Sequence, residues 1–257
     1  MQWLFGALAT ALVVAPFYVF YLLKQFRSFQ RKHEPLDAQA GKWPRRWDLG
    51  TDLQDPIVRI VFLGDSLLLG TGATKLEGTI AYQVAQEFVR RNRYVEVVNR
   101  AVSRARAADL VGEQTKGLWG DVFIILIGSN DSSHFTPWSR YMRDWHRLIA
   151  ALKQCYPELV LVASSTDVSC APALPRWFAS LVRRRCRRDN QTLRILVEEQ
   201  GFYYVDLFRY GKLLYIEDPA LYAADKFHPS DKGYARLTDV FLKVLRQALD
   251  EQRKDSA

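Results

Sequence analysis

Residues that crosslink a chain or bind metal ions are scarce in this sequence, which has three cysteines and four histidines among 257 residues. Cys155, Cys170 and Cys186 show no CxxC spacing and no flanking histidine pattern, so neither a disulfide framework nor a zinc site is predicted. Internal repeats and low-complexity tracts are also missing. With 49% hydrophobic residues, the chain is long enough for one α/β domain with a full core and a short extra segment.

Acidic residues are outnumbered by basic ones, which gives a formal charge of +8. Such a surface attracts anionic partners, whether phospholipid head groups, nucleic acid or an acidic substrate, and charge alone does not choose among them. The densest basic run, residues 183–188, consists of five arginines around Cys186. It is interpreted first as the solvated face of a helix, and second as a contact with a membrane or an anionic substrate.

Charged residues are absent from residues 3–23, a run about as long as the roughly 20 apolar residues of a bilayer-spanning helix. We predict a transmembrane anchor within residues 1–27. A cleavable signal peptide is disfavoured, because no Lys or Arg precedes the run and Lys24 and Arg27 follow it in place of a small-residue cleavage site. The alternative is a buried core helix. Because the anchor supplies a membrane partner for the basic surface, no nucleic acid partner is expected.

Cations cluster on one side of the predicted anchor only, and the positive-inside rule therefore predicts that the domain following the anchor lies in the cytoplasm. Residues 28–55 are polar and basic, carry Pro35 and Pro44, and are predicted to be a linker. Trp43 and Trp47 in this linker are expected either at the level of the lipid head groups or packed on the domain.

Short apolar runs alternate with longer amphipathic stretches throughout residues 56–257, the pattern of βαβ units and a parallel sheet. Strands are predicted at residues 57–63, 94–98, 122–127, 159–163 and 202–205, and helices at residues 79–91, 105–116, 138–155, 175–200 and 230–250. This order predicts a three-layer, flavodoxin-like sandwich with a five-stranded parallel sheet, preceded by the transmembrane helix. Ligands bind outside the carboxyl ends of the strands in such folds.

Polar motifs follow the first and third predicted strands. The first is Gly64-Asp65-Ser66-Leu67, in which a serine at the strand exit can present its hydroxyl above the sheet. Gly128-Ser129-Asn130-Asp131 is the second, and its asparagine can donate a hydrogen bond to a developing oxyanion. Taken singly, each is also ordinary turn chemistry.

A third motif, Asp225-Lys226-Phe227-His228-Pro229, precedes the last predicted helix. The proline after His228 disfavours helical backbone there, which places the imidazole on a loop. An aspartate three residues earlier can bond the imidazole Nδ1 and leave Nε2 free to take a proton from a serine hydroxyl.

These three motifs, in this chain order, resemble the blocks of the SGNH (GDSL-type) hydrolase family over about residues 57–249. The resemblance implies that Ser66 is the nucleophile, His228 the general base and acid, Asp225 its orienting partner and Asn130 a side-chain oxyanion donor. The backbone N–H of Ser66 would be a further donor.

One block departs from the family pattern, because Arg104 stands where the family has an oxyanion glycine. Its backbone N–H is retained, but a positive φ at this position would add strain of about 1 kcal/mol or more. Either Arg104 lines the cleft and meets an anionic part of the substrate, or it turns outward.

The combined prediction is a membrane-anchored serine esterase that acts on a small-molecule or lipid ester, such as a lysophospholipid or a thioester, without a metal or organic cofactor. A transferase that passes the acyl group to a sugar remains an alternative. A rival from another class is an inactive, membrane-tethered binding module.

Overall fold

The computed structural model describes residues 42–50, 52, 55–210 and 218–255, together with residues 20, 21, 24 and 28. Its strands form one sheet in the order β1-β3-β2-β4-β5-β6. Their bounds are β1 (Arg46–Leu49), β2 (Ile57–Gly64), β3 (Tyr94–Asn99), β4 (Val122–Leu126), β5 (Leu159–Ala163) and β6 (Tyr203–Val205). All neighbours run parallel except β1, which pairs antiparallel with β3.

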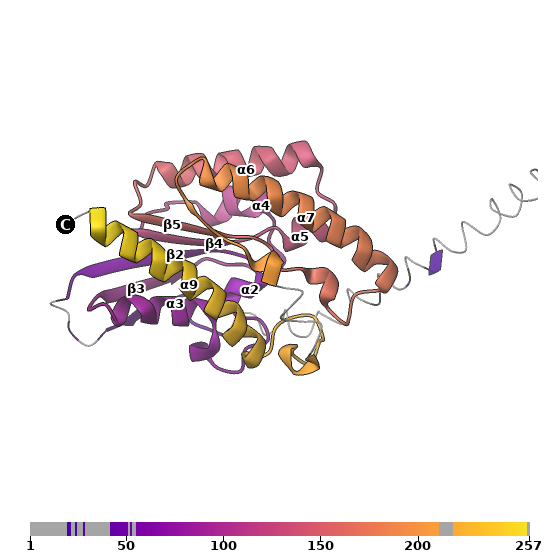
Figure 1. The fold of residues 1–257 in the computed structure, drawn as a ribbon, viewed down its shortest axis with the longest axis horizontal. Coiled ribbons are helices and arrows are strands. Elements are labelled where there is room, and N and C mark those ends of the chain that lie inside the picture. The colour runs from indigo at the N-terminus through magenta and orange to yellow at the C-terminus, as the bar shows by residue number, and fades with distance from the viewer. Residues whose placement is uncertain are drawn as a thin grey trace, which may run out of the picture.

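Helices cover both faces of the sheet (Figure 1). The longer ones are α3 (Ile80–Val89), α6 (Trp138–Lys153), α7 (Arg176–Glu198) and α9 (Asp231–Asp255), and the shorter ones are α2 (Ser66–Leu69), α4 (Ala107–Asp109), α5 (Ser129–Ser133) and the single turns η1 (Leu76–Gly78), η2 (Leu110–Gln114), η3 (Val168–Cys170) and η4 (Pro219–Leu221). Each predicted helix overlaps one of them. The mostly parallel α/β sandwich is therefore confirmed.

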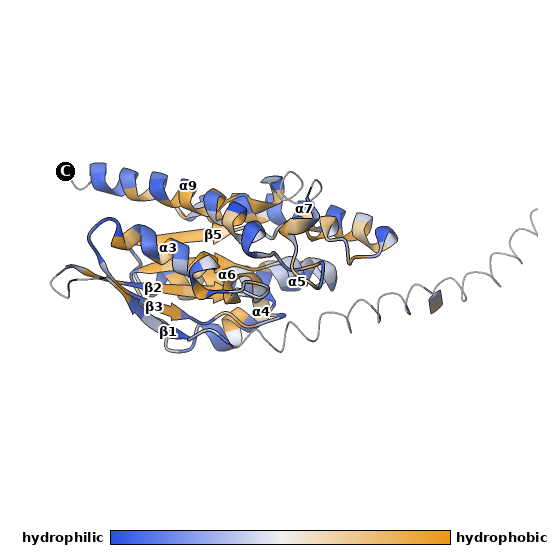
Figure 2. Ribbon diagram, turned by 90° about the horizontal axis from the view of Figure 1, so that it is seen from below, coloured by the Kyte–Doolittle hydropathy of each residue, from blue (hydrophilic) through white to orange (hydrophobic). Residues whose placement is uncertain are grey.

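Two apolar cores lie between the layers. One contains the α3 and α9 side chains against one face of the strands, and the other contains those of α6 and α7 against the opposite face. Figure 2 shows apolar strands between helices whose outward faces are hydrophilic. Because both faces of β2 and β4 are covered, their residues are almost all buried and the strands are continuous apolar runs.

The predicted number of strands is wrong by one, because β1 lies inside residues 28–55, which we predict as linker. Trp47 and Leu49 pack against the core on the α3 and α9 side, and Trp43 joins them there. The four residues of β1 alternate between exposed and half-buried positions, as expected of an edge strand. Such a short alternation, next to Pro44 and two arginines, gives the sequence no sustained period.

The predicted anchor, residues 3–23, lies outside the described residues apart from Phe20 and Tyr21. Within the part of the chain that the structure describes, no helix has the length and apolar character to cross a bilayer.

Candidate active site

Ser66 lies at the carboxyl end of β2, as the first residue of α2. Asp65 caps this helix, and its Oδ1 accepts a hydrogen bond of 3.0 Å from the backbone N–H of Leu67. Gly64 is needed for the close approach of β4, since a Cβ there would lie 2.3 Å from the carbonyl oxygen of Leu126. The turn therefore presents Ser66 in a fixed position above the sheet.

Two buried side chains hold this turn from outside. Gln114 accepts a 2.8 Å hydrogen bond from the Gly64 N–H and donates one of 2.9 Å to the Gly64 carbonyl oxygen, as a neighbouring strand would. Asn99, at the end of β3, donates to the carbonyl oxygen of Leu68 over 2.9 Å. Neither contact follows from the sequence motifs, because Gln114 and Gly64 are far apart in the chain.

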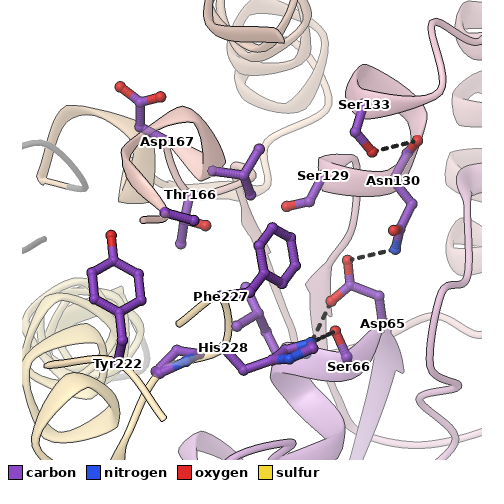
Figure 3. A pocket seen from close by; sticks show the side chains of 14 residues that line it. Asp65, Ser66, Ser129, Asn130, Ser133, Thr166, Asp167, Tyr222, Phe227 and His228 are labelled. Carbon is purple, nitrogen blue, oxygen red and sulfur yellow. Dashed lines mark hydrogen bonds between the residues drawn. The ribbon is translucent and has the colours of Figure 1, made fainter. Parts of the chain in front are cut away.

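His228 lies on the loop before α9, and the structure brings it to Ser66. Its Nε2 lies 3.0 Å from Ser66 Oγ (Figure 3). Its Nδ1 lies 2.6 Å from Asp225 Oδ2. Asp225 Oδ1 also accepts hydrogen bonds from the backbone N–H groups of Phe227 and His228. Burial would raise the pKa of the Asp225 carboxyl, but these hydrogen bonds outweigh burial and hold the pKa below its usual range.

Asn130 is the second residue of α5, the short helix that follows β4. Gly64 pairs with Leu126, so β2 and β4 end at the same edge of the sheet. The segments that follow them therefore place Ser66 and Asn130 next to each other. The Asn130 amide donates over 3.0 Å to the Ala105 carbonyl oxygen and lies 3.5 Å from Asp65 Oδ2. Burial raises the pKa of the Asp65 carboxyl to about 7. The hydrogen bond from the Leu67 N–H and the nearby His228 act in the opposite direction and lower this pKa, but burial outweighs them.

A cavity of about 40 Å³ opens beside the Ser66 hydroxyl. Besides the predicted residues Ser66, Asn130 and His228, it is lined by side chains from the loops after β4 and β5 and before α9, among them Ser129, Thr166, Asp167, Val168, Ala171, Tyr222 and Phe227 (Figure 3). The contribution of the β5 loop is not among the predicted site residues. Its signal was the polar stretch Ser164-Ser165-Thr166-Asp167 directly after a predicted strand, at the edge where ligands bind.

Arg104 is exposed and is absent from the residues that line this cavity. Its φ is 62°, in the left-handed region that favours glycine, so the position does carry the backbone conformation that a glycine accommodates without strain. The neighbouring segment is fixed by Asp131 Oδ2, which accepts a 2.9 Å hydrogen bond from the Ala107 N–H.

Hydrogen bonds link a serine, a histidine and a carboxylate at the carboxyl edge of this flavodoxin-like sheet. That arrangement of side chains is the one found in serine hydrolases. The sequence model of the GDSL-like lipase/acylhydrolase family matches residues 62–236. The chain therefore belongs to this family, as the motifs predict.

Among characterised proteins, the chain is 25% identical over 214 residues to the GDSL-like esterase Rv1075c of Mycobacterium tuberculosis. That match covers 76% of this chain and 64% of the relative, so the chain spans less than two thirds of the relative's length.

Solved structures share the fold. A putative lipolytic protein of the G-D-S-L family from Desulfitobacterium hafniense superposes with a TM-score of 0.58 at 15% identity, covering 73% of this chain and 99% of its own. A catalytic mutant of the acetylxylan esterase Axe2 from Geobacillus stearothermophilus gives a TM-score of 0.54 at 20% identity, over 73% and 93% of the two chains. TesA gives 0.59 at 14% identity, over 74% and 99%.

Proposed function

We propose that this protein is a serine esterase that hydrolyses an acyl ester through an acyl-enzyme intermediate. The observation that carries the proposal is the hydrogen-bonded chain from Ser66 Oγ through both nitrogens of His228 to Asp225, with distances of 3.0 and 2.6 Å. A serine with a base at hydrogen-bonding distance, and a third group that orients the base, is the arrangement that activates a hydroxyl nucleophile.

In the proposed reaction, Ser66 Oγ attacks the ester carbonyl carbon and His228 Nε2 takes the serine proton. Asp225 stabilises the imidazolium that forms and keeps Nδ1 protonated. The oxyanion lies near the Ser66 N–H, which is in the first turn of α2 where N–H groups lack partners within the helix, and near the Asn130 amide. His228 then protonates the leaving alcohol, and a water molecule activated by the same nitrogen releases the acid.

The size of the cavity supports a small acyl group. At roughly 10 to 15 Å³ for each enclosed water molecule, about 40 Å³ has room for about three such units, the size of an acetyl or propionyl group. Val168, Ala171 and Phe227 supply apolar contacts for it. Long acyl chains, as in the lysophospholipids favoured by the sequence argument, would require the loops after β5 and before α9 to move apart. A panel of aryl esters of increasing chain length tests this, and a rate maximum at eight or more carbons would contradict it.

Labelling with a fluorophosphonate probe tests the proposal directly, because the probe reacts with an activated serine and leaves an ordinary hydroxyl unmodified. We expect the probe to label the wild-type chain and to leave the Ser66→Ala variant unlabelled. Ser180→Ala is the matched control, since Ser180 is an exposed serine of α7 that only donates to the Trp177 carbonyl oxygen, and it should be labelled normally. An unlabelled wild-type chain would favour the inactive binding module, and ester turnover that requires a sugar acceptor would favour the transferase.

We also propose that residues 3–23 anchor the enzyme to a membrane with the catalytic domain in the cytoplasm. The support is the uncharged run and the cations that follow it. A carboxyl-terminal alkaline phosphatase fusion in a bacterial host should be inactive and a fluorescent-protein fusion bright; the reverse pattern would place the domain on the other side.

A further inference from the structure

A second hollow, lined mainly by arginines, lies between α7 and the segment that leaves β6. We call it the arginine groove, and it has a volume of about 460 Å³. Residues of one face of α7 form one wall, at the helical spacing of positions 183, 187, 190, 191 and 194, and residues 204, 206, 208 and 209 form the other. Neither the catalytic chain nor the cavity beside Ser66 uses its arginines.

The walls of the groove are built on buried polar contacts. Asn190 is buried and exchanges hydrogen bonds with the backbone and hydroxyl of Ser165, and Tyr204 donates over 3.1 Å to the Asn190 carbonyl oxygen. Asp167, also buried, pairs with Arg183 through a distance of 3.3 Å between Nε and Oδ2. These contacts fix the backbone of α7 opposite the residues that follow β6.

Positive charge exceeds negative charge within the groove, which contains four arginines against Asp167 and Asp206. Arg183 is paired with Asp167, and Arg194 with Glu198 at 2.8 Å. Asp206 accepts a hydrogen bond from the backbone N–H of Arg209. Among the described residues, the Arg187 and Arg209 side chains have no ion-pair partner, so two guanidinium groups on opposite walls remain to neutralise a ligand.

We propose that the arginine groove binds a phosphate group, as free phosphate or as the head group of a phosphate-bearing lipid. Guanidinium groups bind tetrahedral oxyanions through paired N–H donors, and two of them on opposite walls contact one phosphate from both sides. Asp167 lines both the groove and the cavity beside Ser66, so the phosphate lies next to the site of ester cleavage. This assigns anion recognition to α7 and not to Arg104, and it stands whether or not the chain is an esterase.

The test uses the full-length Ser66→Ala protein in neutral detergent, because no ester is then consumed. Thermal unfolding is followed during a titration with sodium phosphate and, at equal ionic strength, with sodium chloride. We expect phosphate to raise the Tm more than chloride does. Arg187→Gln and Arg209→Gln should each weaken phosphate binding about tenfold, the loss expected for one charge-assisted contact.

Arg184→Gln is the matched control, because it removes the same charge from an exposed position of the same helix outside the groove, and it should bind phosphate as the parent does. Arg187 and Arg209 are exposed, so each variant is expected to fold, and its Tm in chloride checks this. Equal effects of phosphate and chloride, or equal losses in Arg184→Gln and Arg187→Gln, would overturn the proposal.

A second titration separates the two sources of phosphate by comparing a single-chain phosphomonoester lipid with inorganic phosphate and with an uncharged lipid of the same chain length. Tighter binding of the phosphomonoester lipid than of either comparison compound, weakened about tenfold by Arg187→Gln, identifies a head-group site. Equal affinity for the lipid and for inorganic phosphate identifies a free phosphate site.

Discussion

Ser66 and His228, the two halves of the hydrogen-bonded chain, are positioned by contacts of very different range. The Ser66 turn is held by Gln114, Asn99 and Asn130, which lie between 31 and 65 residues away from the groups they contact. The His228 loop is held mostly by itself: Asp225 bonds residues two and three positions on, and the Ala223 N–H donates over 2.8 Å to the His228 carbonyl oxygen. The position of the proposed nucleophile therefore depends on the assembled sheet, whereas that of the proposed base depends mostly on contacts within a short loop.

The largest effect on ester hydrolysis should come from replacing the side chains of the His228 loop that form the hydrogen-bonded chain. His228→Ala removes the proton acceptor, and we expect ester hydrolysis to fall by at least about 10⁴-fold. Asp225→Asn should retain more activity, because the amide keeps the loop geometry while it disturbs the imidazole tautomer. Rates of hydrolysis of a short aryl ester, measured at saturating enzyme, test both expectations. A lower rate for Asp225→Asn than for His228→Ala would contradict the assigned roles.

Breaking the long-range support should instead affect stability and catalysis together. Gln114→Leu leaves the buried Gly64 N–H unpaired, whereas the Gly64 carbonyl oxygen keeps its 3.0 Å hydrogen bond from the Val102 N–H. The substitution should cost about 1 to 3 kcal/mol of unfolding free energy. Urea unfolding measures the loss, and kcat should fall in the remaining folded protein. Gln83→Leu is the control, since that exposed amide donates only to the Glu77 carbonyl oxygen. Equal losses for the two variants would show that the Gln114 contacts do not fix the turn.

The Asp65 carboxyl, which lies in the Ser66 turn, should make the stability of the folded protein depend on pH. Its pKa of about 7 in the folded protein lies above the ordinary value of 3.8, so the folded state holds this proton more tightly than the unfolded state does. The resulting stability is fully present below pH 3.8 and is lost as pH rises through about 7. Between pH 5 and pH 8, this group should remove roughly 2.5 kcal/mol of stability.

Asp65→Asn should flatten that part of the pH profile, because the amide does not titrate and its oxygen still caps α2. Chemical denaturation of both proteins at pH 5, 6, 7 and 8 provides the comparison. An unchanged slope in Asp65→Asn would assign the titration to another group.

The smallest effect is expected at Arg104, in the loop that follows β3. Glycine adopts a φ of 62° without the Cβ clash, so Arg104→Gly should stabilise the protein by roughly 0.5 to 1 kcal/mol. Arg106, at a φ of −117°, is the matched control, and Arg106→Gly should destabilise the protein slightly. If Arg104→Gly were the more destabilising of the two, contacts of the Arg104 side chain would outweigh the relief of its backbone.

The sequence motifs predicted the self-contained loop better than the long-range support. Asp225 and His228 lie three residues apart, so their pairing follows from local turn geometry. The five apolar strands were long enough to be recognised, and their carboxyl ends placed Ser66 and Asn130 together. Gln114 and the residues of the β5 loop acquire their roles only through strand register and helix packing, which one sequence without pairing information does not specify.

The hydrogen bond between Ser66 and His228 joins positions 162 residues apart, near opposite ends of the folded domain's chain. α9 begins three residues after His228 and packs on α3 and β6, so we expect His228 to reach Ser66 only when this last part of the chain has folded. During synthesis, the Ser66 turn leaves the ribosome long before the histidine does, and the nascent chain carries an unactivated hydroxyl in the meantime. Under the proposed function, ester hydrolysis would therefore require both ends of the domain's chain, and a chain truncated before His228 would not cleave esters.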